Sequence, residues 1–218
     1  MVEALVAHGA DLALRRADGY TAHTLAELHG NRDVAAWLLG HGAADELSPI
    51  ERFAAACAQG DRAAARAMLD ARPGLRAELR PEHHLMLARP AERGNAAVLE
   101  TMLECGFDPH ARDKDNVTAL HRAAMAGYPD AVRVLLRFGA DVNALDGMFS
   151  ATPLVWAVEG RGHPGRGADH VTVAKMLIAA GSSVEWTPPA GAPNPEQTQE
   201  ELMELRRAAA ADQNSVVV

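Results

Sequence analysis

The chain has 218 residues and a formal net charge of −8 at pH 7; 48% of its residues are hydrophobic, alanine being the most frequent, and only 4% are aromatic. Alanine is the strongest helix former, whereas strands favour β-branched and aromatic side chains, so the composition predicts an all-α protein and excludes an all-β sandwich or barrel. The negative charge argues against general binding of nucleic acid, which needs a basic surface to displace counterions.

The start of the chain and its cysteines bear on location. Met1-Val2-Glu3 opens without the basic segment and apolar stretch of a secretory signal. No apolar run approaches the roughly 20 residues that span a bilayer. Cys57 and Cys105 are too few for a disulfide framework. We therefore expect a cytoplasmic protein without a membrane partner, and the excess of arginine and alanine suggests a GC-rich, bacterial genome.

Two glycine positions recur at intervals of about 33 residues, which indicates stacked repeats. One follows the second helix of each expected pair and is found at Gly9, Gly42, Gly106, Gly139 and Gly181. The other separates the two helices of a pair and is found at Gly30, Gly60, Gly94 and Gly127. The array is expected over residues 1–186, divided into 1–16, 17–46, 47–78, 79–112, 113–145 and 146–186.

The first of these segments, 1–16, is expected to be a partial repeat. Val2, Leu5 and Val6 are typical of a second helix whose first partner is missing. A half repeat leaves one apolar face uncovered, and solenoids need polar end caps to stay soluble. Either the start is truncated, or a short helical cap is tolerated, or this face binds something, such as a second copy of the chain.

The second and third full units depart most from the common pattern. In 47–78, Ser48 as N-cap and Glu51 in the first turn predict a helix start with a capping box. In 79–112, Pro90 lies where the first helix should be, so its missing N–H and its ring predict a shortened or kinked helix.

The unit at 113–145 carries the full pattern. Its opening, Thr118-Ala119-Leu120-His121-Arg122-Ala123-Ala124, is followed by Val132-Arg133-Val134-Leu135-Leu136 and by Gly139-Ala140-Asp141-Val142-Asn143. Thr152-Pro153-Leu154 repeats the opening in the next unit. The pattern resembles the ankyrin repeat over roughly residues 1–185. The resemblance implies a solenoid of stacked helix-turn-helix units, in which His121 has a structural role and hydrogen-bonds neighbouring backbone groups.

The unit at 146–186 contains an insertion, 160–169, between its two helices. Loops of this kind often contain functional residues, although the abundance of glycine is equally typical of an insertion that is tolerated without a function. His163 and His170 with Asp169 make it the one place worth testing for a metal, but no pair has zinc-finger spacing. We therefore expect no metal and no cofactor. We also expect no catalytic residue, since neither cysteine has a histidine and an acid at a catalytic spacing.

The end of the chain is expected to cover the last repeat. Residues 187–195 form a proline-rich linker. Residues 196–212 are expected to form a C-terminal capping helix, with acidic residues first and Arg206-Arg207 late, as the helix dipole favours. Leu202, Leu205 and Ala209 share one face of this helix.

The resemblance implies that the chain binds a partner protein or peptide on the concave face formed by fingers and inner helices. The variable position after the motif histidine holds Ala55, Arg89, Arg122 and Trp156 in successive units. Arginine and tryptophan often dominate binding energy. The candidate partner-binding residues are Arg89, Arg93, Arg122, Met125, Met148, Phe149, Trp156 and Glu159.

An alternative function is an enzyme or a small-molecule-binding protein, with its pocket between the concave face and the 160–169 loop. There Glu159, His163 and His170 would act as acid and base, and Arg122 would bind an anion. A closed cavity holding a histidine of perturbed pKa would favour this reading.

Overall fold

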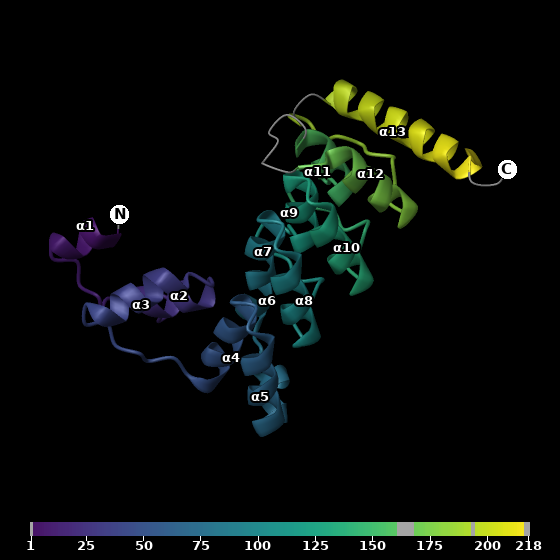
Figure 1. Ribbon diagram of the computed structural model, residues 1–218. Helices are drawn as coiled ribbons and strands as arrows, with labels where there is room; N and C mark the ends of the chain where they lie inside the picture. The colour runs from purple at the N-terminus through teal and green to yellow at the C-terminus, as the bar shows by residue number, and fades with distance from the viewer. Residues whose placement is uncertain (1, 161–167, 193–194, 216–218) are drawn as a thin grey trace.

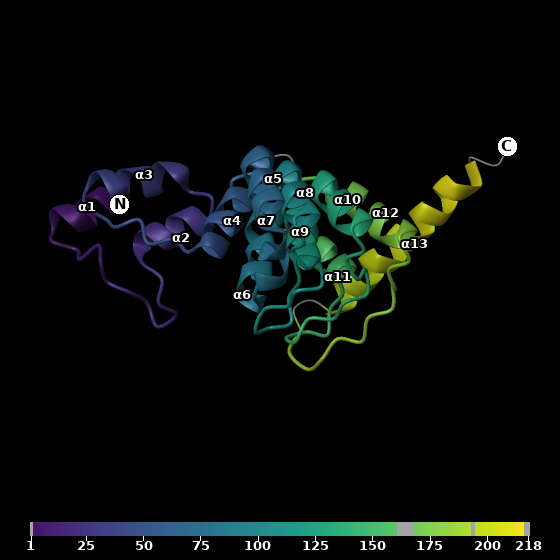
Figure 2. The same cartoon turned by 90° about the horizontal axis from the view of Figure 1, so that it is seen from below.

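The computed structural model describes residues 2–160, 168–192 and 195–215, and every regular element within them is helical. Helices pair along the chain, and the pairs stack side by side in a curved row that runs from the N-terminus to the C-terminus (Figures 1 and 2). The predicted all-α repeat solenoid is confirmed.

Each unit contributes an inner and an outer helix to this row. The inner helices are α2 (Ala22–Leu28), α4 (Pro49–Ala58), α7 (Ala88–Glu92), α9 (Ala119–Ala126) and α11 (Pro153–Gly160). The outer helices are α3 (Arg32–Gly40), α5 (Arg62–Ala71), α8 (Ala96–Glu104), α10 (Pro129–Arg137) and α12 (His170–Ala179). Inner helices α7, α9 and α11 contact one another in sequence, as do outer helices α8, α10 and α12.

Local sequence explains where the helices begin and end. The capping box of α4 is present, because the Ser48 side chain accepts from the Glu51 N–H while the Glu51 carboxylate accepts from the Ser48 N–H. Inner helix α9 ends at Gly127, whose φ of 73° lies in the left-handed region that glycine adopts without steric cost. Such an ending turns the chain back toward the outer helix.

The proline of the third full unit divides its inner helix. The chain forms α6 (Pro81–His84), then a 3₁₀ turn η2 (Leu85–Leu87), then the short α7. Pro90 has no N–H to donate to the carbonyl four residues earlier, which accounts for the tighter turn just before it. A second 3₁₀ segment, η1 (Pro73–Glu78), follows α5.

The core combines large apolar side chains from most of the helices with many buried alanines. Phe53, Leu99, Leu120, Leu135, Leu154 and Leu177 are fully buried, one in each of six helices. Alanines such as Ala91 and Ala123 are fully buried as well, so neighbouring inner helices approach closely. The alanine-rich composition thus serves close helix packing.

The N-terminal helices are less well integrated. Ala26, Ala35 and Leu38 form a small cluster of their own, separate from the main core. Helix α1 (Val2–Ala7) lies at the outer end of the row, and its Leu5 remains 57% exposed. Self-association through this end stays a prediction.

The C-terminal helix α13 (Pro195–Ser215) packs on α11 and α12 at the far end of the row (Figure 1). Leu202 and Leu205 are buried there. The side chain of Ala209, the third residue of the predicted face, lies outside the described side chains. Within the described residues, no helix is both long and apolar enough to cross a membrane.

Candidate partner-binding surface

An apolar pocket of about 250 Å³, named here the Trp156 pocket, lies at the junction of α9, α11 and the finger before α11. It is lined by Met125, Met148, Phe149, Ala151, Val155, Trp156, Glu159 and Trp186. Five of these were candidates from the sequence: Met125, Met148, Phe149, Trp156 and Glu159. The repeat register therefore brings together residues that lie up to 34 positions apart in the chain.

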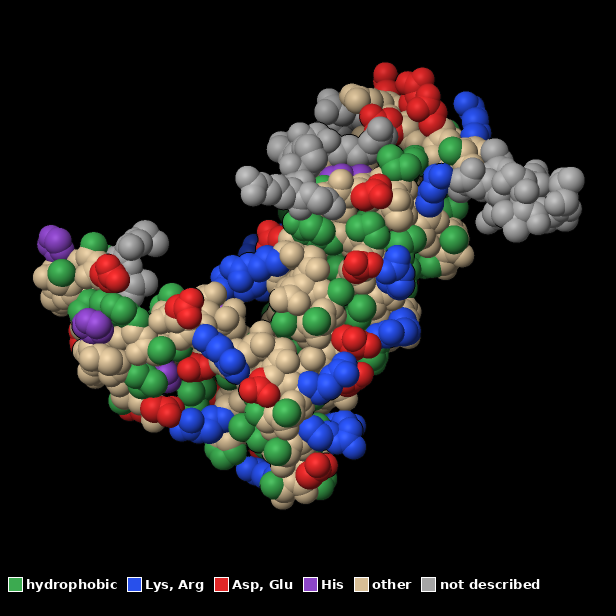
Figure 3. Space-filling model, viewed as in Figure 1, with side chains coloured by type: hydrophobic (Ala, Val, Ile, Leu, Met, Phe, Trp, Pro, Cys, Tyr) green, Lys and Arg blue, Asp and Glu red, His purple; other side chains and the backbone are tan. Residues whose placement is uncertain are grey.

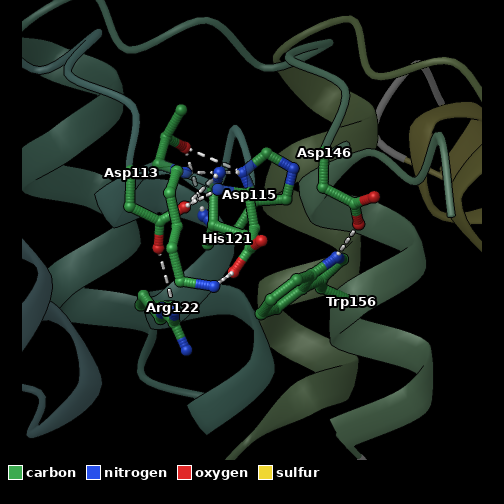
Figure 4. A network of polar contacts seen from close by, with 9 residues as sticks. Asp113, Asp115, His121, Arg122, Asp146 and Trp156 are labelled. Atoms are coloured by element: carbon green, nitrogen blue, oxygen red, sulfur yellow. Dashed lines mark hydrogen bonds and ion pairs between the residues drawn. The ribbon is translucent and has the colours of Figure 1, made fainter. Parts of the chain in front are cut away.

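Trp156 is oriented by a buried carboxylate. Asp146 is only 4% exposed, and its Oδ2 accepts a hydrogen bond of 2.6 Å from the Trp156 indole N–H (Figure 4). Its Oδ1 accepts from the backbone N–H groups of Met148 and Phe149 at 2.9 and 2.7 Å. One carboxylate thus shapes the finger and fixes the indole ring, so the pocket is preformed.

Arg122 occupies the equivalent position one unit earlier and is held in the same way. Its Nη2 lies 3.1 Å from Asp113, and its guanidinium lies over the Trp156 ring, 5.7 Å from the centroid (Figure 4). Burial raises the pKa of Asp113, but the N–H groups of Val117 and Asp115, together with Arg122, hold that pKa below its usual value. Arg122 and Trp156 therefore form one continuous cation–π surface.

His121 supports this surface from beneath. Its Nδ1 accepts from the Thr118 N–H at 3.2 Å, so the ring proton is on Nε2, which donates to the Ala151 carbonyl at 3.1 Å. The ring also contacts Trp156 edge-to-face at 5.3 Å between centroids. Burial lowers the pKa of His121. The expected structural role of this histidine is confirmed.

Flexible and polar side chains form the rim of the Trp156 pocket. Met125 and Met148 are 36% and 47% exposed, while the Glu159 carboxylate accepts a hydrogen bond from the Thr198 hydroxyl of α13. Trp186 donates from its indole N–H to the Phe149 carbonyl at 3.1 Å, which ties the finger to the next unit. The C-terminal segment thus closes one end of the pocket.

Arg89 and Arg93 do not line the Trp156 pocket. They line a second hollow of about 140 Å³, named here the Arg89 pocket, at the ends of α2, α4 and α7. Its other lining residues are Leu28, His29, Gly30, Ala58, Gln59, Met86, Pro90, Asn95 and Val98. The candidate partner-binding residues are therefore distributed over two hollows of the array, and their role in binding stays a prediction.

Of the histidines of the proposed catalytic alternative, His170 is not among the described residues that line the Trp156 pocket. His163 lies outside the described residues. His170 was expected in the inserted loop, but it is the first residue of α12, is 6% exposed, and its Nε2 hydrogen-bonds the Met125 carbonyl at 3.0 Å. It joins α12 to α9 because Gly127 and Gly160 leave room for its ring. Among the described residues lining the pocket, Glu159 is the only titratable carboxylate.

The two cysteines lie in the core. Cys57 and Cys105 are both buried and free. Within the part of the chain that the structure describes, no three histidine, cysteine or acidic side chains are grouped so as to hold a metal ion.

Sequence reasoning missed the residues that position the site. Asp113 and Asp146 are one repeat apart in the fingers, a spacing that could have identified them as a recurring element. Thr198 and Trp186 gave no such signal, because their contacts with Glu159 and Phe149 depend on how the C-terminal segment folds back.

Comparison with known proteins finds a family match for the C-terminal part of the array. Residues 84–186 match the family model for ankyrin repeats in three copies. The chain is similar to the palmitoyltransferase Hip14 of Drosophila melanogaster, with 34% identity over 44% of this chain and 14% of that protein. It is also similar to the serine/threonine-protein kinase VIK of Arabidopsis thaliana, with 48% identity over 29% of this chain and 15% of that protein. A third relative is the glycerophosphocholine phosphodiesterase gde1 of Schizosaccharomyces pombe, with 32% identity over 40% of this chain and 7% of that protein. The chain spans no more than 15% of the length of each of these relatives.

Proposed function

We propose that this chain, whose residues 84–186 are ankyrin repeats, is a binding module that receives one large apolar side chain of a partner protein in the Trp156 pocket. The observation that carries the proposal is a preformed apolar pocket beside a fixed arginine–tryptophan pair. Arginine and tryptophan are among the side chains that most often contribute a large part of the binding free energy in protein interfaces.

The size and lining of the pocket support a protein partner over a cofactor. Pockets for small molecules usually measure about 300–1,000 Å³, above the 250 Å³ found here, whereas this volume suits a single side chain. Met125 and Met148 at the rim are flexible and adapt to the shape of an entering side chain. The finger tips and inner helices then supply the surrounding contact area.

The relatives support the same reading. Their names denote three different enzymes, yet each similarity is confined to a small part of those proteins. A segment shared among proteins of such different names is better explained by binding than by a common reaction. We further propose a cytoplasmic location, because both cysteines are free and buried, as is usual in a reducing compartment.

The proposal is tested by removing the exposed apolar rim without disturbing the core. The double variant Met125→Ser/Met148→Ser should fold normally, since both residues lie at the rim of the pocket and neither belongs to the buried core. Affinity capture followed by mass spectrometry, and then binding of the purified partner, should show the interaction with the wild type and its loss in this variant.

Met203→Ser is the matched control, because Met203 is exposed to a similar extent (37%) but lies on α13. It should bind the partner as the wild type does. Equal binding by all three chains would place the site away from the Trp156 pocket and contradict the proposal.

A further inference from the structure

Arginines of the array are almost all neutralised by carboxylates of the same chain. Within residues 2–160 and 168–192, each arginine has a carboxylate oxygen within ion-pair distance, except Arg76, Arg89 and Arg93. Arg76 donates instead to the Glu104 carbonyl. Arg89 and Arg93 therefore form the one place in the described array where two neighbouring cations have no carboxylate partner.

The geometry of this pair favours a ligand that accepts hydrogen bonds. Arg89 and Arg93 are four residues apart on and just after α7, so their side chains share one face. The Nη1 atom of Arg89 is buried and has no acceptor among the described residues. A buried donor without an acceptor costs free energy that an incoming acceptor would recover.

A third titratable side chain lies near the pair. His29, from the end of α2, lines the same hollow. Burial lowers the pKa of this histidine most, and the positive charges of Arg89, Arg16 and Arg93 lower it further. Figure 3 shows basic side chains beside the recess between the N-terminal helices and the rest of the array, with acidic side chains close to them.

We propose that the Arg89 pocket binds an aspartate or glutamate side chain of the same partner segment that fills the Trp156 pocket. This inference rests on the proposed function and adds the chemistry of the partner. A carboxylate matches the planar fork of a guanidinium and accepts two hydrogen bonds from it. It would satisfy the buried Arg89 Nη1 and neutralise Arg93 at the same time.

The arrangement of the helices predicts the spacing of the two partner residues. Arg89 is on α7 and Trp156 is on α11, with α9 between them. Packed helices lie about 8–10 Å apart, so the two sites are about 16–20 Å apart. An extended segment advances about 3.3 Å per residue, which separates the acidic and the apolar residue by about five or six positions.

The experiment is selection from a random peptide library displayed on phage, with the full chain as the target. Wild-type chain should select peptides in which an acidic residue and a large apolar residue recur at the predicted spacing. The variant Arg89→Gln/Arg93→Gln should still select the apolar residue but lose the acidic one. Arg66→Gln/Arg133→Gln is the matched control: it removes the same charge from exposed, ion-paired arginines of α5 and α10, and should select as the wild type does.

A selected peptide then gives the magnitude. Replacing its acidic residue by Asn or Gln should weaken binding to the wild type by about 10-fold to 100-fold, the range for a charge-assisted hydrogen-bonded pair, but should leave binding to Arg89→Gln/Arg93→Gln unchanged. Arg93→Gln alone, at an exposed position, repeats the test should the double variant fold poorly.

The failures of the two proposals are distinguishable. Apolar peptides selected without any acidic preference would overturn the carboxylate site and leave the proposed function standing. A wild-type chain that selects no peptide would overturn both. Stabilisation of the wild type but not of Arg89→Gln/Arg93→Gln by inorganic phosphate, without acidic preference in the peptides, would assign the pocket to a free anion and overturn the inference.

Discussion

Asp146→Asn tests whether one carboxylate holds the Trp156 pocket in shape. Oδ1 of Asp146 accepts from the N–H groups of Met148 and Phe149, and Oδ2 accepts from the Trp156 indole. Asparagine keeps the shape but replaces one oxygen by an NH₂ group. Whichever way the amide turns, a donor then faces either the indole N–H or the finger N–H groups. At least one bond is therefore lost.

The expected loss of stability follows from these contacts. The bond from Trp156 to a charged acceptor is worth about 1.5–3 kcal/mol, and the bonds that remain lose about half their strength when the acceptor becomes neutral. Because Trp156 is partly exposed, water recovers some of this energy. We expect the free energy of unfolding to fall by about 2–4 kcal/mol, measured by urea unfolding with circular dichroism and tryptophan fluorescence. The same variant should bind the partner more weakly, since the indole ring is released.

Asp113→Asn is the matched control, because Asp113 is the equivalent residue one unit earlier. It also accepts two backbone N–H groups, but its side-chain partner is Arg122, at a partly exposed position. Water and other contacts replace this bond more readily, so its loss should cost about 1 kcal/mol or less. Equal destabilisation by the two variants, or a neutral Asp146→Asn, would refute the idea that the bond between the Trp156 indole and the Asp146 carboxylate organises the pocket.

Two further predictions concern the residues beneath the pocket. Gly160→Ala should lower the free energy of unfolding by about 1–3 kcal/mol, because the new Cβ would collide with the Met125 carbonyl oxygen. Gly40→Ala is the control, because the space around its Cβ is open, and it should be neutral or slightly stabilising. Burial lowers the pKa of His121, so below an unfolded pKa of about 6.5 the unfolded chain binds the proton first and the free energy of unfolding decreases with falling pH. Denaturant unfolding from pH 7 to pH 5 should show a smaller decrease for His121→Gln than for the wild type or for the exposed His110→Gln, and equal decreases would contradict this role of His121.

The features that depend on local rules were predictable from the sequence. The glycine before outer helices α3, α5, α8 and α10, the capping box at Ser48 and the break near Pro90 all follow from backbone geometry within a few residues. The role of His121 was predictable through the family pattern, since the backbone groups that it binds belong to the pattern itself. Repetition makes such local rules sufficient for the fold, because each unit packs only on its neighbours.

The site was predictable only as far as the repeat register reaches. The register places Trp156 beside Arg122, because both hold the same position in adjacent units. It also places Arg89 on the same inner face, but it does not show that this side chain turns toward the ends of α2 and α4. His170 could not be placed from sequence either, since its hydrogen bond to Met125 depends on the close approach of α12 to the end of α9.

The recurring finger aspartate suggests how such an array changes specificity without losing its fold. Asp113 and Asp146 both accept backbone N–H groups of their own finger, and each then uses its second oxygen on the variable residue of the following inner helix. The variable residue is arginine in one unit and tryptophan in the next, yet both side chains have an N–H group that reaches the carboxylate. Any side chain with a donor at this distance would be oriented in the same way, whereas an aliphatic one would leave the second oxygen without that partner. We therefore expect Trp156→Arg to preserve the stability of the array while replacing the apolar preference of the pocket by an acidic one, whereas Trp156→Leu should lower both stability and binding. Peptide selection with the two variants measures the first effect, and urea unfolding measures the second. An unstable Trp156→Arg variant would show that the pocket depends on the indole ring itself and not on the bond to Asp146.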